Sequence, residues 1–395
     1  MTGSATGTSL RPAAPAELAE ALATALDGGP PVAPLPLEPR GRARALAALR
    51  PDDPVDDDVA VVVLSSGSTA EPKGVVLSRA AVRAGARATH DRLGGPGHWL
   101  LALPVHHVAG LMVLARAHLA GTAVVPLARD LSDLPDLGDT GRPGGRRYLS
   151  VVPTQLVRAL ARPRVVEALA GLDAVLVGGG AAEESLLDRA RAAGVPCVTT
   201  YGMSETCGGC VYDGVPLDGV EVRLGEDDGR ISVAGPVLFS GYRGRPARTS
   251  RASEPGWFRT ADRGAWVRSF QGSRRLRVLG RVDDVVVSGG HNVDLAAVEA
   301  RAQSWPGRGT AEVVVVGVPH PEWGTEVVAV ADAAVRAGGS EGRTLAALQD
   351  WVRAGLEAYA APRRLVVLDR LPRTGGDKVD RRRLVAELGP GGTAP

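Results

Sequence analysis

The chain has 395 residues, 46 of them Lys or Arg against 44 Asp or Glu, and 44% are hydrophobic. The balance of charge disfavours a nucleic-acid partner, and no run approaches the 18 apolar residues of a membrane-spanning helix. The composition is typical of a soluble globular protein with two or three domains. Because the N-terminus lacks the basic-then-apolar pattern of a signal peptide, we expect a cytoplasmic location.

Strand and helix patterns alternate through the first 200 residues. Helices are expected at residues 16–26, 79–93, 111–119 and 183–193, and one more from Pro153 onward. Strands are expected at residues 59–64, 99–104, 123–127, 148–152, 174–177 and 197–200. This alternation predicts an open α/β sheet, whose ligands bind at the carboxyl ends of the strands.

The pattern changes after Gly214. Short strands at residues 220–224, 229–233, 257–258 and 276–279 predict a β-rich subdomain. A compact unit follows, with helices at residues 294–304 and 345–356 and strands at residues 312–318, 327–332 and 364–368. We therefore expect a large domain of residues 1–280 and a small domain of residues 281–395.

The segment SSGSTAEPKG, residues 65–74, follows the first long apolar strand pattern. Its hydroxyl groups, its glycines and Lys73 suit a polyphosphate, since they supply short donors, close backbone approach and a cation. Lys73 and Lys378 are the only lysines in an arginine-rich sequence. Their retention indicates sites where a compact ammonium cannot be replaced by a guanidinium fork.

Five segments in order resemble the motifs of the adenylate-forming superfamily, which includes the acyl-CoA synthetases. They are SSGSTAEPKG, YGMSET at residues 201–206, RTAD at residues 259–262, GRVDD at residues 280–284 with two glycines after it, and PRTGGDK at residues 372–378. Ala261 and Asp377 stand where this superfamily usually has glycine. The resemblance implies an adenylate-forming α/β fold: a large N-terminal α/β domain with a β-rich subdomain and a small mobile C-terminal α+β domain.

The resemblance also assigns roles in ATP binding. The β- and γ-phosphates are expected at Ser65, Ser66, Thr69 and Lys73, and the adenine at Gly179, Gly180, Ala181, Ala182 and Tyr201. Gly202 is expected to bind ATP as well. Glu205 would bind Mg²⁺, because this hard ion prefers carboxylate oxygen. Thr206 would contact the α-phosphate, Asp262 and Arg281 the ribose hydroxyls, and Lys378 the reacting carboxylate and α-phosphate.

Two further segments, PVHHVAG at residues 104–110 and VPTQL at residues 152–156, are similar to those of ligases that join o-succinylbenzoate to CoA in menaquinone biosynthesis. The similarity implies an AMP-forming acid–thiol ligase that uses ATP, Mg²⁺ and CoA. His107, Thr154 and Arg158 are the expected carboxylate-binding residues, with His107 also near the chemistry. Gly289 and Gly290 would border the CoA tunnel, and Asp283 would be the hinge of the small domain.

Alternatives stay open at this point. Another aryl or medium-chain acid could be the substrate, and Ala261 and Asp377 are compatible with a nucleotide-binding protein that has lost turnover. Arg158 could be an ordinary surface arginine, and Asp283 an ordinary turn residue. The expected partners are small molecules, with no nucleic acid and no membrane, and the sequence leaves homo-oligomer formation undecided.

Overall fold

A computed structural model describes residues 8–65, 73–137, 145–269, 272–336, 341–374 and 378–389. The chain divides into two compact units. The first comprises residues 1–223, 232–260 and 266–276, and the second comprises residues 224–231, 261–265 and 277–395. Two segments before residue 277, residues 224–231 and 261–265, belong to the second unit. The domain boundary expected between residues 280 and 281 therefore stays a proposal.

One sheet of the first unit has five strands in the order β1-β2-β3-β4-β14. Its strands are β1 (Arg11–Ala13), β2 (Val32–Pro34), β3 (Val59–Ser65), β4 (Lys73–Ser78) and β14 (Gly241–Tyr242). The helices that follow these strands in the sequence are α1 (Leu18–Leu26), α2 (Pro39–Leu49), α3 (Arg79–Arg92) and α8 (Pro246–Ala252). β3 is an apolar, β-branched run that is buried from Val59 to Val63, as expected for a central strand.

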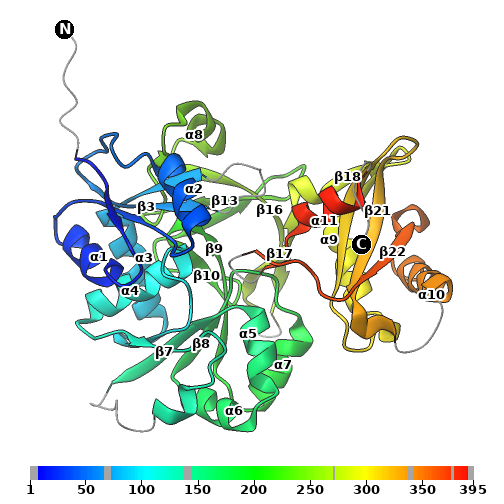
Figure 1. Cartoon of the computed structure of the whole chain (residues 1–395), viewed down its shortest axis with the longest axis horizontal. Coiled ribbons are helices and arrows are strands. Elements are labelled where there is room, and N and C mark those ends of the chain that lie inside the picture. The colour runs from blue at the N-terminus through cyan, green and yellow to red at the C-terminus, as the bar shows by residue number, and fades with distance from the viewer. Residues whose placement is uncertain are drawn as a thin grey trace. The chain divides into compact units, whose positions relative to one another are not determined.

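The other sheet has seven strands in the order β11-β10-β9-β8-β7-β5-β6. Figure 1 labels four of them, β7, β8, β9 and β10. Its strands are β5 (Gly97–Leu101), β6 (Val125–Pro126), β7 (Arg146–Val151), β8 (Ala174–Val177), β9 (Cys197–Met203), β10 (Gly208–Tyr212) and β11 (Val215–Pro216). The intervening helices are α4 (Val108–Ala120), η1 (Leu134–Leu137), α5 (Pro153–Leu160), α6 (Pro163–Ala170), α7 (Glu184–Ala192) and η2 (Ser204–Thr206). Strands β9, β8, β7, β5 and β6 run parallel, so their carboxyl ends share one edge.

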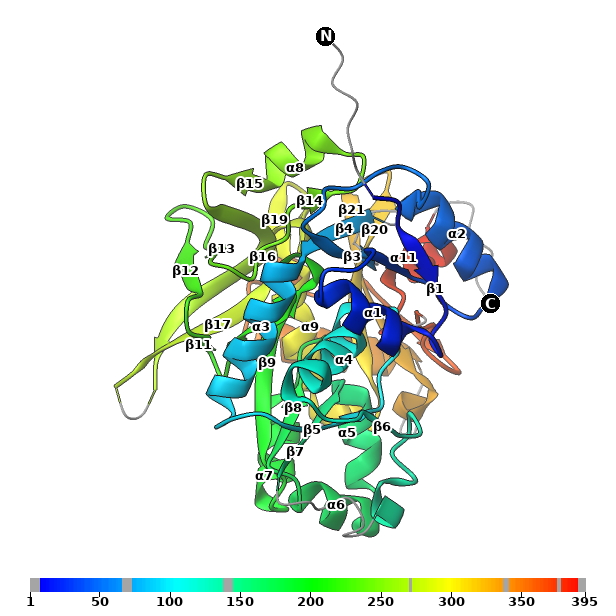
Figure 2. The same ribbon diagram turned by 90° about the vertical axis from the view of Figure 1, so that its left-hand side faces the viewer.

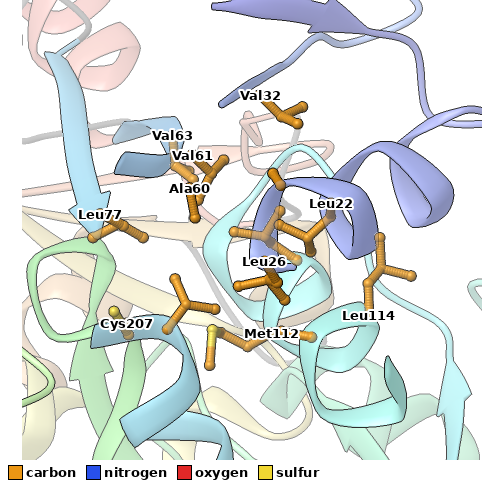
Figure 3. Close-up of a cluster of buried hydrophobic side chains, with 14 of the residues drawn as sticks. Leu22, Leu26, Val32, Ala60, Val61, Val63, Leu77, Met112, Leu114 and Cys207 are labelled. Carbon is orange, nitrogen blue, oxygen red and sulfur yellow. The ribbon is translucent and has the colours of Figure 1, made fainter. Parts of the chain in front are cut away.

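The main core of the first unit lies between the five-stranded sheet and three helices. α1, α3 and α4 pack against one another (Figure 2). Side chains from α1, β3, β4 and α4 converge in one apolar cluster, among them Leu22, Val61, Leu77 and Met112 (Figure 3). A second cluster joins β7 and β8 to α5, α6 and α7. These cores fix the strand ends that carry the candidate site.

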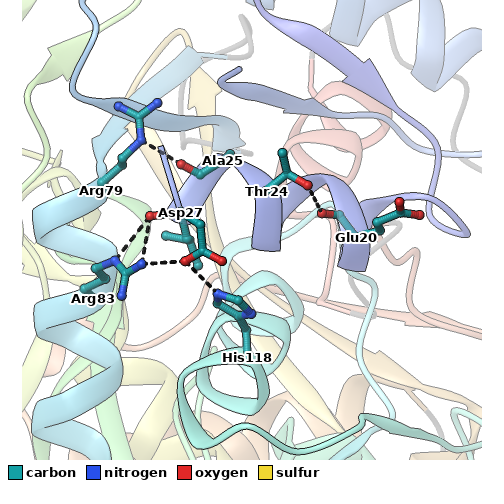
Figure 4. A network of polar contacts seen from close by, with 8 residues as sticks. Glu20, Thr24, Ala25, Asp27, Arg79, Arg83 and His118 are labelled. Atoms are coloured by element: carbon teal, nitrogen blue, oxygen red, sulfur yellow. Dashed lines mark hydrogen bonds and ion pairs between the residues drawn. The ribbon is translucent and has the colours of Figure 1, made fainter. Parts of the chain in front are cut away.

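A polar cluster around Asp27 fastens the end of α1 to α3 and α4 (Figure 4). The Asp27 carboxylate accepts hydrogen bonds from Arg83 at 2.7 Å and pairs with His118 at 3.2 Å. Arg79 donates to the carbonyl of Ala25 at 2.6 Å. The His118 contact is the main cause that lowers the pKa of Asp27. The cluster holds the C-terminus of α1 in place.

The second unit is built on its own sheet, β19-β18-β21-β20, with β22 paired to β21. Its elements are η3 (Val282–Asp284), β18 (Val285–Ser288), β19 (His291–Asp294), α9 (Leu295–Gln303), η4 (Pro306–Arg308), β20 (Val313–His320), β21 (Gly324–Asp332), η5 (Ala333–Arg336), α10 (Glu341–Arg353), η6 (Ala358–Ala360), β22 (Arg364–Leu368) and α11 (Arg381–Leu388). Apolar side chains of α9, α10, β20 and β21 form its core.

A further sheet contains β12 (Glu221–Leu224), β13 (Arg230–Ala234), β15 (Ser253–Glu254), β16 (Trp257–Arg268) and β17 (Arg274–Arg281).

Several expected elements need correction. Lys73 was expected in a loop but is the first residue of β4, which pairs antiparallel with β3. The segment from Tyr201 to Met203 continues β9 because it pairs with β10. The strand expected at residues 257–258 extends to Arg268. Within the described residues, no helix is long and apolar enough to cross a membrane.

The buried position of His90 indicates that the stability of the folded protein depends on pH. The indole nitrogen of Trp99 donates to His90 Nε2 at 3.2 Å, so His90 must be neutral to accept. Burial, helped by Arg116, lowers the pKa of His90 to about 4. As the pH falls, His90 of the unfolded chain takes up a proton at a higher pH than His90 of the folded protein. The free energy of unfolding is therefore highest above about pH 6.5 and decreases as the pH falls toward 4. We expect the free energy of unfolding to drop by about 2 kcal/mol from this site between pH 7 and pH 5.

Urea unfolding at the two pH values measures this loss. In the variant His90→Gln, which cannot take up the proton, the decrease between pH 7 and pH 5 should be smaller by about the same amount. An equal decrease in the wild type and the variant would show that His90 does not control the acid sensitivity.

Candidate active site

Several of the expected binding residues of the first unit lie at or near the carboxyl edge of the seven-stranded sheet. His107 follows β5, Thr154 follows β7, and Gly179 and Gly180 follow β8. Tyr201 lies near the end of β9. Because these strands are parallel, the segments that follow them emerge at one edge, which is the usual ligand site of such sheets.

The loop after β8 is built for an exposed ligand surface. Gly179 has φ +77°, in the left-handed region, and a side chain on Gly180 would meet no atom within 4 Å. Gly179, Gly180 and Ala181 are exposed, and Ala182 packs partly against the apolar cluster below. The loop can therefore present backbone to a flat ring, as the adenine role requires.

Gly202 has a different reason to be glycine. It pairs with Gly209 on β10, and a Cβ atom there would stand 1.9 Å from the carbonyl oxygen of Gly208. The close approach is between two strands of the protein. The role of Gly202 in ATP binding stays a prediction, while its identity follows from strand packing.

Thr206 is buried and its hydroxyl closes the turn after β9. The hydroxyl accepts from Met203 N at 2.9 Å and donates to the carbonyl of Gly208 at 2.7 Å. The turn continues into Cys207, which has φ +52°. Thr206 therefore fixes the backbone of η2 and with it the position of Glu205. Its contact with an α-phosphate stays a prediction.

Ser65 and Lys73 face each other across the β3–β4 pair. Lys73 is only 8% exposed. The Ser65 hydroxyl oxygen is buried and, within the described part of the chain, has no hydrogen-bond partner. A buried hydroxyl without a partner is costly unless a ligand or water completes it, so this position fits an anion. Ser66 and Thr69, also expected at the phosphates, lie outside the described residues.

Gly74 was expected to admit a ligand, but the structure gives another cause. A Cβ atom at Gly74 would lie 2.8 Å from Arg243 Cβ and 3.1 Å from Val62 Cγ1. Arg243 N also donates to the Gly74 carbonyl at 2.8 Å. The glycine therefore allows the segment after β14 to pack against β4.

Sequence reasoning missed Tyr242, which stands between two predicted site residues. Its hydroxyl donates to Glu205 Oε1 at 2.8 Å, and Lys73 Nζ lies 5.3 Å from its ring centroid. Burial, with Glu205 second, raises the pKa of Tyr242. Tyr242 carried no recognised motif signal, since its contact with Glu205 depends on pairing between β14 and β4.

The expected carboxylate-binding residues occupy different environments. His107 is the N-cap of α4, and its ring centroid lies 4.3 Å from that of His106. Thr154 is half-buried in the first turn of α5, whereas Arg158 is exposed on that helix. Gln155 anchors the turn, because its amide donates to the carbonyls of Ala102 and Arg129 at 3.1 and 2.7 Å. The VPTQL segment thus ties α5 to the segments that follow β5 and β6.

The second unit brings together three predicted site residues. Arg281 Nη1 lies 3.4 Å from Asp262 Oδ1. Burial lowers the pKa of the Lys378 ammonium. The negative charge of Asp262 raises this pKa, and the positive charge of Arg281 lowers it further.

The expected hinge and CoA-binding residues lie on consecutive elements of the second unit. Asp283 is within η3, directly after β17. Gly289 and Gly290 form the turn of the β18–β19 hairpin, with φ +57° and +83°, the geometry that favours glycine in two-residue turns. Gly289 N donates to the Trp323 carbonyl at 3.0 Å. The turn is therefore anchored at its first glycine.

Comparison with known proteins identifies the family. Residues 3–243 match the AMP-binding enzymes, and residues 298–378 match the AMP-binding enzyme C-terminal domain. The chain belongs to the AMP-binding enzymes. The probable 2-succinylbenzoate–CoA ligase of Mycobacterium tuberculosis is 46% identical over 380 residues, which cover 94% of this chain and 95% of that protein.

Solved structures of similar fold support the same family. The o-succinylbenzoate CoA synthetase of Bacillus subtilis, in complex with the acyl-adenylate intermediate OSB-AMP, has a TM-score of 0.68 and 30% identity, covering 82% of this chain and 68% of that one. The same protein with ATP and magnesium ion has a TM-score of 0.69 and 26% identity, covering 93% and 82%. The expected adenylate-forming fold is confirmed.

Proposed function

We propose that this enzyme activates o-succinylbenzoate as an acyl-adenylate and transfers it to CoA. The observation that carries the proposal is the 46% identity to a probable 2-succinylbenzoate–CoA ligase, which extends over nearly all of both chains. Several described residues assigned to this chemistry, among them Ser65, Lys73 and Tyr201, lie at or near strand ends. ATP, Mg²⁺ and CoA are the proposed co-substrates and ion, and the expected pathway is menaquinone biosynthesis.

In the first step a carboxylate oxygen of the acid attacks the α-phosphorus of ATP, and pyrophosphate leaves. Ser65 and Lys73, with Ser66 and Thr69, would hold the β- and γ-phosphates, and Glu205 would supply a carboxylate oxygen to Mg²⁺. The ion would neutralise charge on the phosphates. Lys378 would stabilise the charge that develops between the carboxylate and the α-phosphate.

The nucleoside part needs a flat surface and two hydroxyl contacts. Gly179, Gly180, Ala181 and Ala182 would line the adenine, with Tyr201 against the ring. Gly202 would belong to the same ATP site. Asp262 and Arg281 would take the ribose hydroxyls. Their ion pair is consistent with this role, because a carboxylate oriented by a guanidinium can accept hydrogen bonds from hydroxyl groups.

In the second step the CoA sulfur attacks the acyl carbonyl carbon, the thiol proton is released, and AMP leaves with the electron pair of the broken carbon–oxygen bond. Gly289 and Gly290 would border the path of the thiol arm. Rotation about Asp283 would exchange the Lys378 loop for that hairpin. The boundary between residues 280 and 281 is proposed for this motion.

Pyrophosphate release from ATP with a panel of carboxylic acids tests the assignment. We expect o-succinylbenzoate to give the highest kcat/KM by at least tenfold. A higher value with another aromatic or medium-chain acid would assign a different substrate. Binding of ATP without pyrophosphate release on any acid would contradict turnover altogether.

Arg158 is the proposed contact of the substrate's second carboxylate. This carboxylate must stay charged while the succinyl one reacts, and an anion in a partly dry site needs a cation or donors. Arginine suits that task through its two parallel N–H donors, with His107 and Thr154 as polar neighbours. In Arg158→Ala we expect the KM for o-succinylbenzoate to rise by one to two orders of magnitude, about 1.4–2.8 kcal/mol.

Steady-state kinetics with both substrates measures this change. The KM for ATP should stay constant, and an analogue without the benzoate carboxylate should bind the variant and the wild type alike. Arg164→Ala on α6, whose side chain is 80% exposed, is the matched control. A normal KM for o-succinylbenzoate in Arg158→Ala would make Arg158 an ordinary surface residue.

A further inference from the structure

Glu205 is held at two points by a segment that is distant in the sequence. Its carbonyl accepts from Phe239 N at 2.9 Å, and its Oε1 accepts from the Tyr242 hydroxyl at 2.8 Å. The Glu205 and Tyr242 residues are 7% and 8% exposed. A buried carboxylate needs such donors, since desolvation without them is costly. Both contacts lie within the first unit.

The hydrogen bond from Tyr242 restrains the Glu205 carboxylate. The hydroxyl donates to Oε1 at 2.8 Å. A carboxylate with one oxygen fixed by a donor cannot rotate without breaking that bond. The hydrogen bond therefore also sets the direction of the second oxygen, Oε2.

The same tyrosine also faces the phosphate-binding lysine. Lys73 Nζ lies 5.3 Å from the Tyr242 ring centroid, within the range of cation–π attraction. Arg248 approaches the ring as well, at 5.6 Å. Phe239 stands edge-on to the Tyr242 ring, with ring centroids 4.9 Å apart, and Phe258 packs in turn on Phe239 at 5.1 Å.

We propose that Tyr242 is a positioning residue which orients Glu205 for the metal ion through its hydroxyl and Lys73 for the phosphates through its ring. The proposal rests on the proposed function, in which Glu205 binds Mg²⁺ and Lys73 binds phosphate. The new element is that one side chain of β14 contacts both the residue proposed to bind the metal ion and the residue proposed to bind the phosphates. Outer groups that hold a metal-binding carboxylate typically change metal affinity by about 10- to 100-fold when removed.

Two substitutions separate the two contacts. Tyr242→Phe removes the hydroxyl and keeps the ring, so it breaks the contact with Glu205 and leaves the contact of the ring with Lys73. Tyr242→Leu removes both. Tyr212→Phe is the matched control, because Tyr212 is also buried and its hydroxyl lies 3.0 Å from Thr89 Oγ1, outside the proposed site.

The experiment measures Mn²⁺ binding by electron paramagnetic resonance with α,β-methylene-ATP, which cannot form an adenylate. We expect Tyr242→Phe to raise the Kd of Mn²⁺ about tenfold or more and Tyr212→Phe to leave it unchanged. Affinity for the analogue without metal should fall in Tyr242→Leu and not in Tyr242→Phe. Raising Mg²⁺ should restore the adenylation rate of Tyr242→Phe. Thermal unfolding verifies that each variant is folded.

A double-variant cycle with Glu205→Gln distinguishes failure of the proposal from failure of the proposed function. If Tyr242 acts through Glu205, Tyr242→Phe should weaken Mn²⁺ binding by less than twofold in the Glu205→Gln background. Unchanged binding in Glu205→Gln itself would overturn the metal role of Glu205. Weakened binding in Glu205→Gln together with normal binding in Tyr242→Phe would overturn only the positioning role of Tyr242.

Discussion

Substitution of Lys378 by alanine is expected to slow formation of the acyl-adenylate by about 10²-fold or more, the scale of one lost transition-state charge contact, ~3 kcal/mol. Lys378 is one of two lysines in the chain, and it lies near Asp262 and Arg281 in the second unit. The ammonium would meet negative charge that develops only as the carboxylate attacks phosphorus. The loss should therefore appear in kcat of the first step.

Single-turnover assays of each half-reaction measure this effect. Thioester formation from supplied acyl-adenylate and CoA should proceed near the wild-type rate, which serves as the internal control for folding. Lys378→Arg should also be slow, because a planar fork cannot take the place of a compact ammonium. Equal decreases in the rates of adenylate formation and thioester formation would contradict the role assigned to Lys378.

Replacing Asp283 by proline is expected to separate the two activities in the opposite sense. Proline fixes φ near −65° and removes a donor, so it restricts the backbone between β17 and β18. If residue 283 is the pivot, the enzyme should still form the adenylate. Transfer to CoA should fall by about 10²-fold, which corresponds to ~3 kcal/mol of added barrier.

Burst kinetics should then show one equivalent of bound acyl-adenylate followed by slow thioester release. Asp283→Ala is the matched control, because it leaves the backbone able to rotate, and it should retain both activities. Wild-type rates for both steps in Asp283→Pro would place the hinge elsewhere.

Local sequence patterns were sufficient for much of the fold. The strand at residues 174–177 was predicted at its observed bounds, and the helix after β7 begins at Pro153 as expected. These elements have strong local causes, an apolar β-branched run and a proline suited to the first helical turn. The order of the five motifs then indicated the family without any structural information.

The contacts that depend on distant pairing could not be predicted. Lys73 was placed in a loop because the segment before it is rich in glycine and hydroxyls, yet β3 provides the partner that makes it a strand residue. Tyr242 reaches Glu205 only because β14 pairs with β4. The identities of Gly74 and Gly202 follow from packing against Arg243 and β10, which no local pattern reveals.

The most direct test of the account is mass spectrometry of the product made from o-succinylbenzoate, ATP, Mg²⁺ and CoA. We expect o-succinylbenzoyl-CoA, AMP and pyrophosphate in equal amounts, and no thioester when ATP or CoA is omitted. Absence of the thioester with the complete mixture, from enzyme shown to be folded, would contradict it.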